Sequence, residues 1–108
     1  MIKIKLNLQK KNLNISFIKQ GDIFKNHGQV DCIFSHGVLE HFSNEQIFNI
    51  LNRQKQEAKY VIHYVPTNNY ESPSFGDERL MPIEWWVKTF KPTNWFTFND
   101  KKDLALIW

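Results

Sequence analysis

Apolar residues are grouped along the chain in short runs whose length and composition favour β-strands. Residues 15–18, 30–34 and 60–65 are rich in β-branched and aromatic side chains, and each run leads into Gly, Pro or a polar turn. Residues 95–98 and 104–108 flank a polar turn, so an antiparallel hairpin is expected at the end of the chain.

Two helices are predicted between these runs. The first is expected to begin at Ser43 and to continue to about Lys59, because Ser43 and Gln46 have the spacing of a capping box and apolar residues then recur at helical spacing. The second is expected to begin with Pro82 at its first position and to end before Pro92.

The order of these elements is typical of an α/β fold with a mostly parallel sheet and an antiparallel end. The length of 108 residues suits a single domain over residues 1–108, and a hydrophobic content of 42% is enough to bury a core. Residues 3–13 fit a strand and one face of a helix equally well, and residues 67–77 form a long polar loop.

Charge and cysteine content exclude several classes of protein. The formal net charge is +3, with lysines concentrated near the start, but the first 25 residues contain no Arg and few aromatics, so a nucleic-acid partner is not expected. Cys32 is the sole cysteine, which excludes an intramolecular disulfide and a cysteine zinc cage, and no histidine spacing suggests a metal site. No apolar stretch is long enough for a signal peptide or a membrane span, so the cytoplasm is the expected location.

Residues 31–42 read DCIFSHGVLEHF, an apolar run followed by a small polar turn and an amphipathic segment. This stretch resembles the fourth-strand motif of class I S-adenosylmethionine-dependent methyltransferases of the small-molecule type. Residues 17–24, 60–66 and 76–86 resemble, in order, the third-strand motif of that family, its fifth strand with the following Pro, and the segment before its next helix. The resemblance implies a Rossmann-like sheet, S-adenosyl-L-methionine as cofactor and a small-molecule methyl acceptor.

The resemblance covers the C-terminal two-thirds of the family's domain. The family's glycine-rich cofactor loop has no counterpart, because none of the four glycines of this chain lies in a G-x-G pattern. The resemblance therefore implies a truncated domain, missing the family's first strands and weak or inactive alone. Its third strand could gain a neighbour by different strand pairing, by use of residues 2–8, or by pairing with a second copy or a missing N-terminal half. Whether the chain is an enzyme stays open, and a non-catalytic remnant that dimerises or docks on a partner is the alternative.

The resemblance also assigns cofactor contacts. It places Asp22 and Ile23 against the adenine, and Ser35, His36 and Gly37 beside the methionine and sulfonium groups. From the residues alone, Asp22 could equally cap a turn, and residues 35–37 could be a plain strand-to-helix turn.

His41 is the candidate general base, because imidazole titrates near neutrality, although a buried or capping role explains it as well. Glu40 is expected to be exposed or salt-bridged. Among the four tryptophans, Trp85 lies off the helical stripe and is expected to face a partner. The candidates for an acceptor pocket are Tyr64, Thr67, Asn68, Tyr70, Glu78 and Arg79. Arg79 could instead form an ion pair with Glu78 that anchors the loop.

Overall fold

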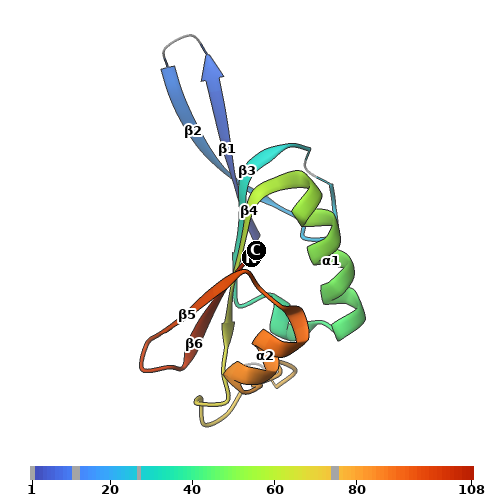
Figure 1. The fold of residues 1–108 in the computed structure, drawn as a ribbon, viewed down its shortest axis with the longest axis vertical. Coiled ribbons are helices and arrows are strands. Elements are labelled where there is room, and N and C mark those ends of the chain that lie inside the picture. Colours follow the sequence, from blue (N-terminus) through green and yellow to red (C-terminus); the bar gives the residue numbers. More distant parts are fainter. Residues whose placement is uncertain (1, 11–12, 27, 74–75) are drawn as a thin grey trace.

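The computed structural model describes residues 2–10, 13–26, 28–73 and 76–108, with residues 2–10 and 13–20 described by their backbone. Six strands form one sheet in the order β2-β1-β3-β4-β6-β5, and two α-helices and one short 3-10 helix pack beside it (Figure 1). The strands are β1 (Ile2–Lys10), β2 (Leu13–Gly21), β3 (Val30–His36), β4 (Ala58–Pro66), β5 (Asn94–Phe98) and β6 (Asp103–Ile107). The helices are η1 (Leu39–His41), α1 (Asn44–Glu57) and α2 (Ile83–Phe90).

The sheet is mixed, which corrects the expectation of mostly parallel pairing. Among the described strands, β3 and β4 form the one parallel pair, and the four other pairs are antiparallel. The reason lies in the connections: β1 and β2 follow each other closely, as do β5 and β6, and short connections join antiparallel neighbours. The strands β2, β3, β4 and β5 nevertheless all run in one direction, because β1 and β6 each lie inverted between two of them.

The ambiguous N-terminal segment is a strand. Residues 2–5 of β1 pair with residues 32–35 of β3, so β3 has a backbone partner on each side. Pairing of the first residues of the chain with β3 was one of the expected possibilities, and β1 provides it. Backbone pairing satisfies the N–H and C=O groups that would otherwise face an open edge.

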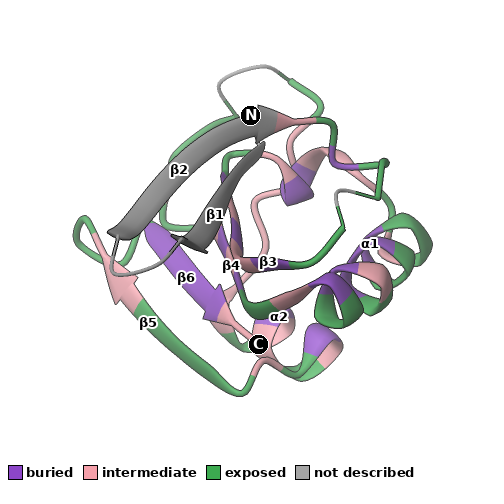
Figure 2. Ribbon diagram, turned by 90° about the horizontal axis from the view of Figure 1, so that it is seen from above, coloured by how far each residue is buried: buried purple, intermediate pink, exposed green. Residues whose placement is uncertain are grey.

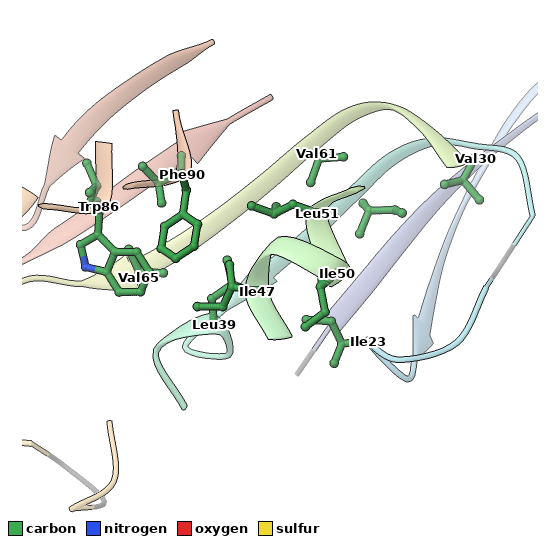
Figure 3. Packing of buried hydrophobic residues seen from close by; sticks show 13 residues of the cluster. Ile23, Val30, Leu39, Ile47, Ile50, Leu51, Val61, Val65, Trp86 and Phe90 are labelled. Carbon is green, nitrogen blue, oxygen red and sulfur yellow. The ribbon is translucent and has the colours of Figure 1, made fainter. Parts of the chain in front are cut away.

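Both α-helices cover the same face of the sheet. Apolar residues of α1 and α2 join one buried cluster with side chains of β3, β4 and β6, whose register places Val65 beside Leu104. Figure 3 shows Ile47 of α1 beside Leu39 of η1, and Trp86 beside Phe90 in α2. Burial is continuous along β6 from residue 103 to residue 106, as expected for a strand between two neighbours and under a helix layer (Figure 2).

The local predictions at the helix ends are largely confirmed. Ser43 Oγ accepts a hydrogen bond from Gln46 N–H at 3.2 Å, and Gln46 Oε1 accepts one from Ser43 N–H at 3.0 Å, so the capping box is formed. The helix ends at Glu57, earlier than expected, because Ala58 already has the extended backbone of β4. Pro82 caps α2 instead of being its first residue, and Lys91 ends that helix in the left-handed conformation at φ 50°.

Candidate functional site

The carboxyl ends of β3 and β4 meet at a pocket of about 150 Å³. It is lined by His36, Gly37, Glu40, Pro66, Tyr70, Glu78 and Asp103. This is the edge at which α/β sheets bind ligands, because the loops that leave the strands there are free to vary. Pockets that enclose a drug-sized ligand measure roughly 300–1,000 Å³. The described pocket therefore suits one polar group of a ligand and not a whole nucleoside cofactor.

Gly37 makes the turn that brings the next residues to this pocket. Its φ is +71°, a conformation that favours glycine, and its N–H donates to the Tyr64 carbonyl at 3.1 Å. An added Cβ would lie 3.6 Å from a carboxylate oxygen of Glu40. The turn thus ties β3 to β4 and leaves Glu40 close beside it.

Glu40 is buried, contrary to the expected exposure. Its side chain is 2% exposed, and its Oε1 has no hydrogen-bond partner among the described residues. Burial is the main cause that raises the pKa of Glu40 above its usual value. Its Oε2 lies 3.6 Å from Nε2 of His41, which is beyond hydrogen-bond distance but within the range of an ion pair with a protonated ring, the other alternative expected for Glu40.

His41, the candidate base, lies at the end of η1 between two acids. Its Nδ1 is 2.9 Å from Asp77 Oδ1, while its Nε2 faces Glu40. A carboxylate only accepts hydrogen bonds, so Nδ1 carries the proton that is shared with Asp77. His41 is not among the residues that line the described pocket, and a base role for it stays a prediction.

Five residues were expected to contact the cofactor, and of these His36 and Gly37 line the pocket. The other three do not. Ser35 is buried, and its Oγ bonds to Nδ1 of His63 in the interior. Asp22 follows β2 and accepts a hydrogen bond from Phe24 N–H at 2.9 Å, which is the turn-capping alternative. Ile23 belongs to the apolar core. These side chains could contact a cofactor in the pocket only after a rearrangement of the structure.

Of the six candidates for the acceptor pocket, Tyr70 and Glu78 line it, and Thr67 is buried. The Tyr70 hydroxyl lies 2.9 Å from both carboxylate oxygens of Asp103, to which it donates. Tyr64 lies instead in a separate pocket of about 210 Å³ with His36, Phe96 and Phe98. Asn68 is exposed, and its N–H donates to the Met81 carbonyl at 3.1 Å.

Arg79 anchors the loop, but through other partners than the expected Glu78. Its guanidinium donates to the Phe42 carbonyl at 2.6 Å and to Asn44 Oδ1 at 2.8 Å, and it lies over the ring of Trp85. Trp85 is therefore partly covered, and Trp95, at 44% exposure, is the tryptophan most open to a partner.

Sequence reasoning named Glu78 as a pocket candidate but missed the two other acids of the pocket, Glu40 and Asp103. Glu40, Glu78 and Asp103 come from η1, the loop before α2 and the start of β6, so their convergence depends on tertiary packing. The turn at Gly37 is the sequence signal that could have indicated Glu40, because a chain that turns at Gly37 places Glu40 near the carboxyl ends of the strands.

No family model, curated protein or solved structure matches this chain. Within the described residues, no helix combines the length and the apolar character that a membrane span requires.

Proposed function

We propose that this chain is a partial, class I methyltransferase-like domain with a Rossmann-like sheet, acting in the cytoplasm on a small molecule. The observation that carries the proposal is the pocket at the carboxyl ends of β3 and β4. His36 and Gly37 lie at the carboxyl end of β3, inside the segment that resembles the family's fourth strand, and Pro66 ends the segment that resembles its fifth strand.

The strand arrangement supports the same proposal. β2 carries the segment that resembles the third-strand motif, and it runs in the direction of β3 with β1 between them. The family's third strand is likewise separated from its fourth by other strands. In this proposal β1 substitutes, in inverted direction, for the family's first two strands.

The charge of the pocket favours a cationic group. Three of its lining residues are acids, Glu40, Glu78 and Asp103, and carboxylates in a partly enclosed space attract positive charge. The sulfonium of S-adenosyl-L-methionine or a protonated amine of a methyl acceptor would supply it. Because the pocket is small and the sequence has no G-x-G loop, we expect weak cofactor binding by this chain.

The test is a titration of the ¹⁵N-labelled chain with S-adenosyl-L-methionine and its demethylated product, followed by amide chemical shifts. We expect a Kd weaker than about 100 µM, which corresponds to a binding free energy less favourable than about −5.5 kcal/mol. The shifts should be concentrated at residues 35–37 and 67–70. Tighter binding would contradict the partial site, and the absence of shifts at these residues at millimolar ligand would contradict the methyltransferase proposal.

Two glycines provide a matched pair of variants. Gly37→Ala strains a φ of +71° inside the pocket, whereas Gly28→Ala strains a φ of +75° with no atom within 4 Å of the new Cβ. Both substitutions should lower stability by about 1 kcal/mol. Only Gly37→Ala should also weaken the titration.

The alternative is a non-catalytic module that dimerises or docks on a partner. It is favoured by β5, an edge strand on which Trp95 and Phe96 are 44% and 50% exposed. Edge strands with exposed aromatics can pair with another chain. Sedimentation of the wild type and of Phe96→Ser distinguishes the two functions, since a dimer that this substitution disrupts would support docking and a monomer at all concentrations would oppose it.

A further inference from the structure

We propose that Glu40, His41 and Glu78 form a binding site for a divalent transition-metal ion at the side of the pocket. One ligand atom from each residue lies within 4.8 Å of the other two. Metal–ligand bonds of about 2.1 Å hold two ligands at most about 4.2 Å apart, so small side-chain rotations would close the set around an ion. This inference does not depend on the methyltransferase proposal.

Glu40 supplies the independent observation that points to a ligand. Its side chain is 98% buried, it lines the pocket, and its Oε1 has no hydrogen-bond partner among the described residues. An unsatisfied buried carboxylate oxygen is costly, and native structures pair such atoms with a donor or a metal ion. A cation between Glu40 and Glu78 would satisfy it.

His41 has the arrangement that metal-binding histidines share. Its Nδ1 is bonded to Asp77 Oδ1 at 2.9 Å, so the neutral ring has its lone pair on Nε2, the atom that faces Glu40. A carboxylate that holds the second ring nitrogen fixes the orientation of the ligand and makes it more basic. The competing explanation is a protonated His41 that forms ion pairs with both acids and needs no metal.

The backbone holds the two halves of the site together. Glu40 and His41 lie in η1, and Asp77 and Glu78 lie in the loop before α2. The N–H of Arg79 donates to the carbonyl of Glu40 at 3.0 Å, which links that loop directly to η1. This backbone contact fixes the two segments that carry the three ligands relative to each other.

The donor set identifies the class of ion. One imidazole and two carboxylates suit Mn²⁺, Fe²⁺ or Zn²⁺, whereas Mg²⁺ and Ca²⁺ favour oxygen ligands alone. Three protein ligands leave coordination positions open, and Glu40 and Glu78 also line the pocket, where a water or a ligand oxygen could bind the ion.

The experiment uses the full chain after chelator treatment and dialysis. Mn²⁺ is titrated with electron paramagnetic resonance detection of the free ion, and Zn²⁺ with a competing chromophoric chelator. We expect one bound ion per chain, with affinity lowered at least tenfold in His41→Gln and in Glu78→Gln. Asp77→Asn should lower it about tenfold through the orientation of His41. Glu71→Gln, which changes an exposed acid of the same loop, should leave it unchanged.

Thermal melts of each variant without metal identify any variant that does not fold. Asp77→Asn should fold in any case, because Asp77 is exposed, and it therefore keeps the proposal testable if the other variants do not fold. The proposal is overturned if neither ion binds with saturation below millimolar concentration. It is equally overturned if binding occurs but responds to none of the three site variants, which would assign the ion to other groups.

Discussion

The Nε2 atom of His63 lies 2.7 Å from Oε1 of Gln54 and joins β4 to α1 through the interior of the domain. The other ring nitrogen bonds to Ser35 Oγ, so the imidazole also links β4 to β3. His63 has an exposed fraction of 0%, and burial lowers its pKa to about 3. The ring is thus neutral in the folded protein, donating from Nε2 and accepting at Nδ1, which is the state that burial tolerates.

The buried His63 makes the domain sensitive to acid. Its pKa is about 3 in the folded protein, against the ordinary value of 6.5 for an exposed ring. Between these two pH values the ring is protonated in the unfolded chain and neutral in the folded chain. The stabilising contribution is complete above pH 6.5 and is lost progressively between pH 6.5 and pH 3. We expect a loss of about 2 kcal/mol by pH 5, measured by urea unfolding at a series of pH values.

Two histidine variants test this assignment. His63→Gln should flatten the acid part of the stability profile, although it lowers stability at neutral pH because the interior network is disrupted. His36→Gln changes an exposed ring and should leave the profile as in the wild type. Equal profiles for His63→Gln and the wild type would show that another group causes the loss.

Arg79 should contribute more to stability than an ordinary surface cation. It donates to the Phe42 carbonyl and to Asn44 Oδ1, and so holds the loop against the start of α1. Arg79→Ala should cost about 2 kcal/mol in chemical unfolding, and Arg79→Lys should recover only part, because an ammonium lacks the planar fork that reaches both acceptors. Lys88→Ala, at an exposed position of α2, is the control and should change stability by less than about 0.5 kcal/mol.

The two reciprocal hydrogen bonds of the capping box between Ser43 and Gln46 should stabilise each other, and a double-mutant cycle measures this coupling. Ser43→Ala removes the acceptor for Gln46 N–H and should cost about 1 kcal/mol. Gln46→Ala removes the reciprocal bond, and the double variant should cost less than the sum of the two, since each bond holds the other side chain in place. Ser72→Ala, in the exposed loop, is the control and should leave the free energy of unfolding unchanged. If the losses of stability at Ser43 and Gln46 are strictly additive, the two hydrogen bonds are not cooperative.

The parts of the fold that sequence reasoning could predict are those decided by neighbours in the chain. The Ser43 cap depends on a residue three positions later, and the C-terminal hairpin depends on a short polar turn between two apolar runs. The inverted position of β1 was beyond such reasoning, because several neighbours could satisfy its backbone and local pattern does not choose among them.

The candidate site was less predictable for the same reason. Gly37 was found because a strand end and a glycine are adjacent in sequence, and the structure places it in the pocket. Ser35 lies in β3 directly before His36, and its side chain is buried on the opposite face of the strand from that of His36, since successive strand residues alternate faces. Glu40 meets Glu78 and Asp103 at the pocket through tertiary packing, and no pattern around residue 40 encodes that convergence.

The bond between Tyr70 and Asp103 closes the pocket on the side of β6, and its removal should loosen the loop without unfolding the domain. Tyr70→Phe should cost about 1–2 kcal/mol, because the hydroxyl donates to a largely buried carboxylate. Asn99 still donates to Asp103 Oδ2 at 2.9 Å, which limits the loss. Hydrogen exchange should accelerate at residues 67–73 and stay unchanged in α1.

The same bond has a signature at high pH. Burial, followed by the hydrogen bond and charge of Asp103, raises the pKa of Tyr70 above 10.0. The unfolded chain therefore loses the phenolic proton first, so the stabilisation present below pH 10.0 is lost as the pH rises further. Unfolding measured on both sides of pH 10.0 should show a steeper decline for the wild type than for Tyr70→Phe. Parallel declines would mean that the Tyr70 hydroxyl is not bonded to Asp103 in solution, and that the pocket is open on this side.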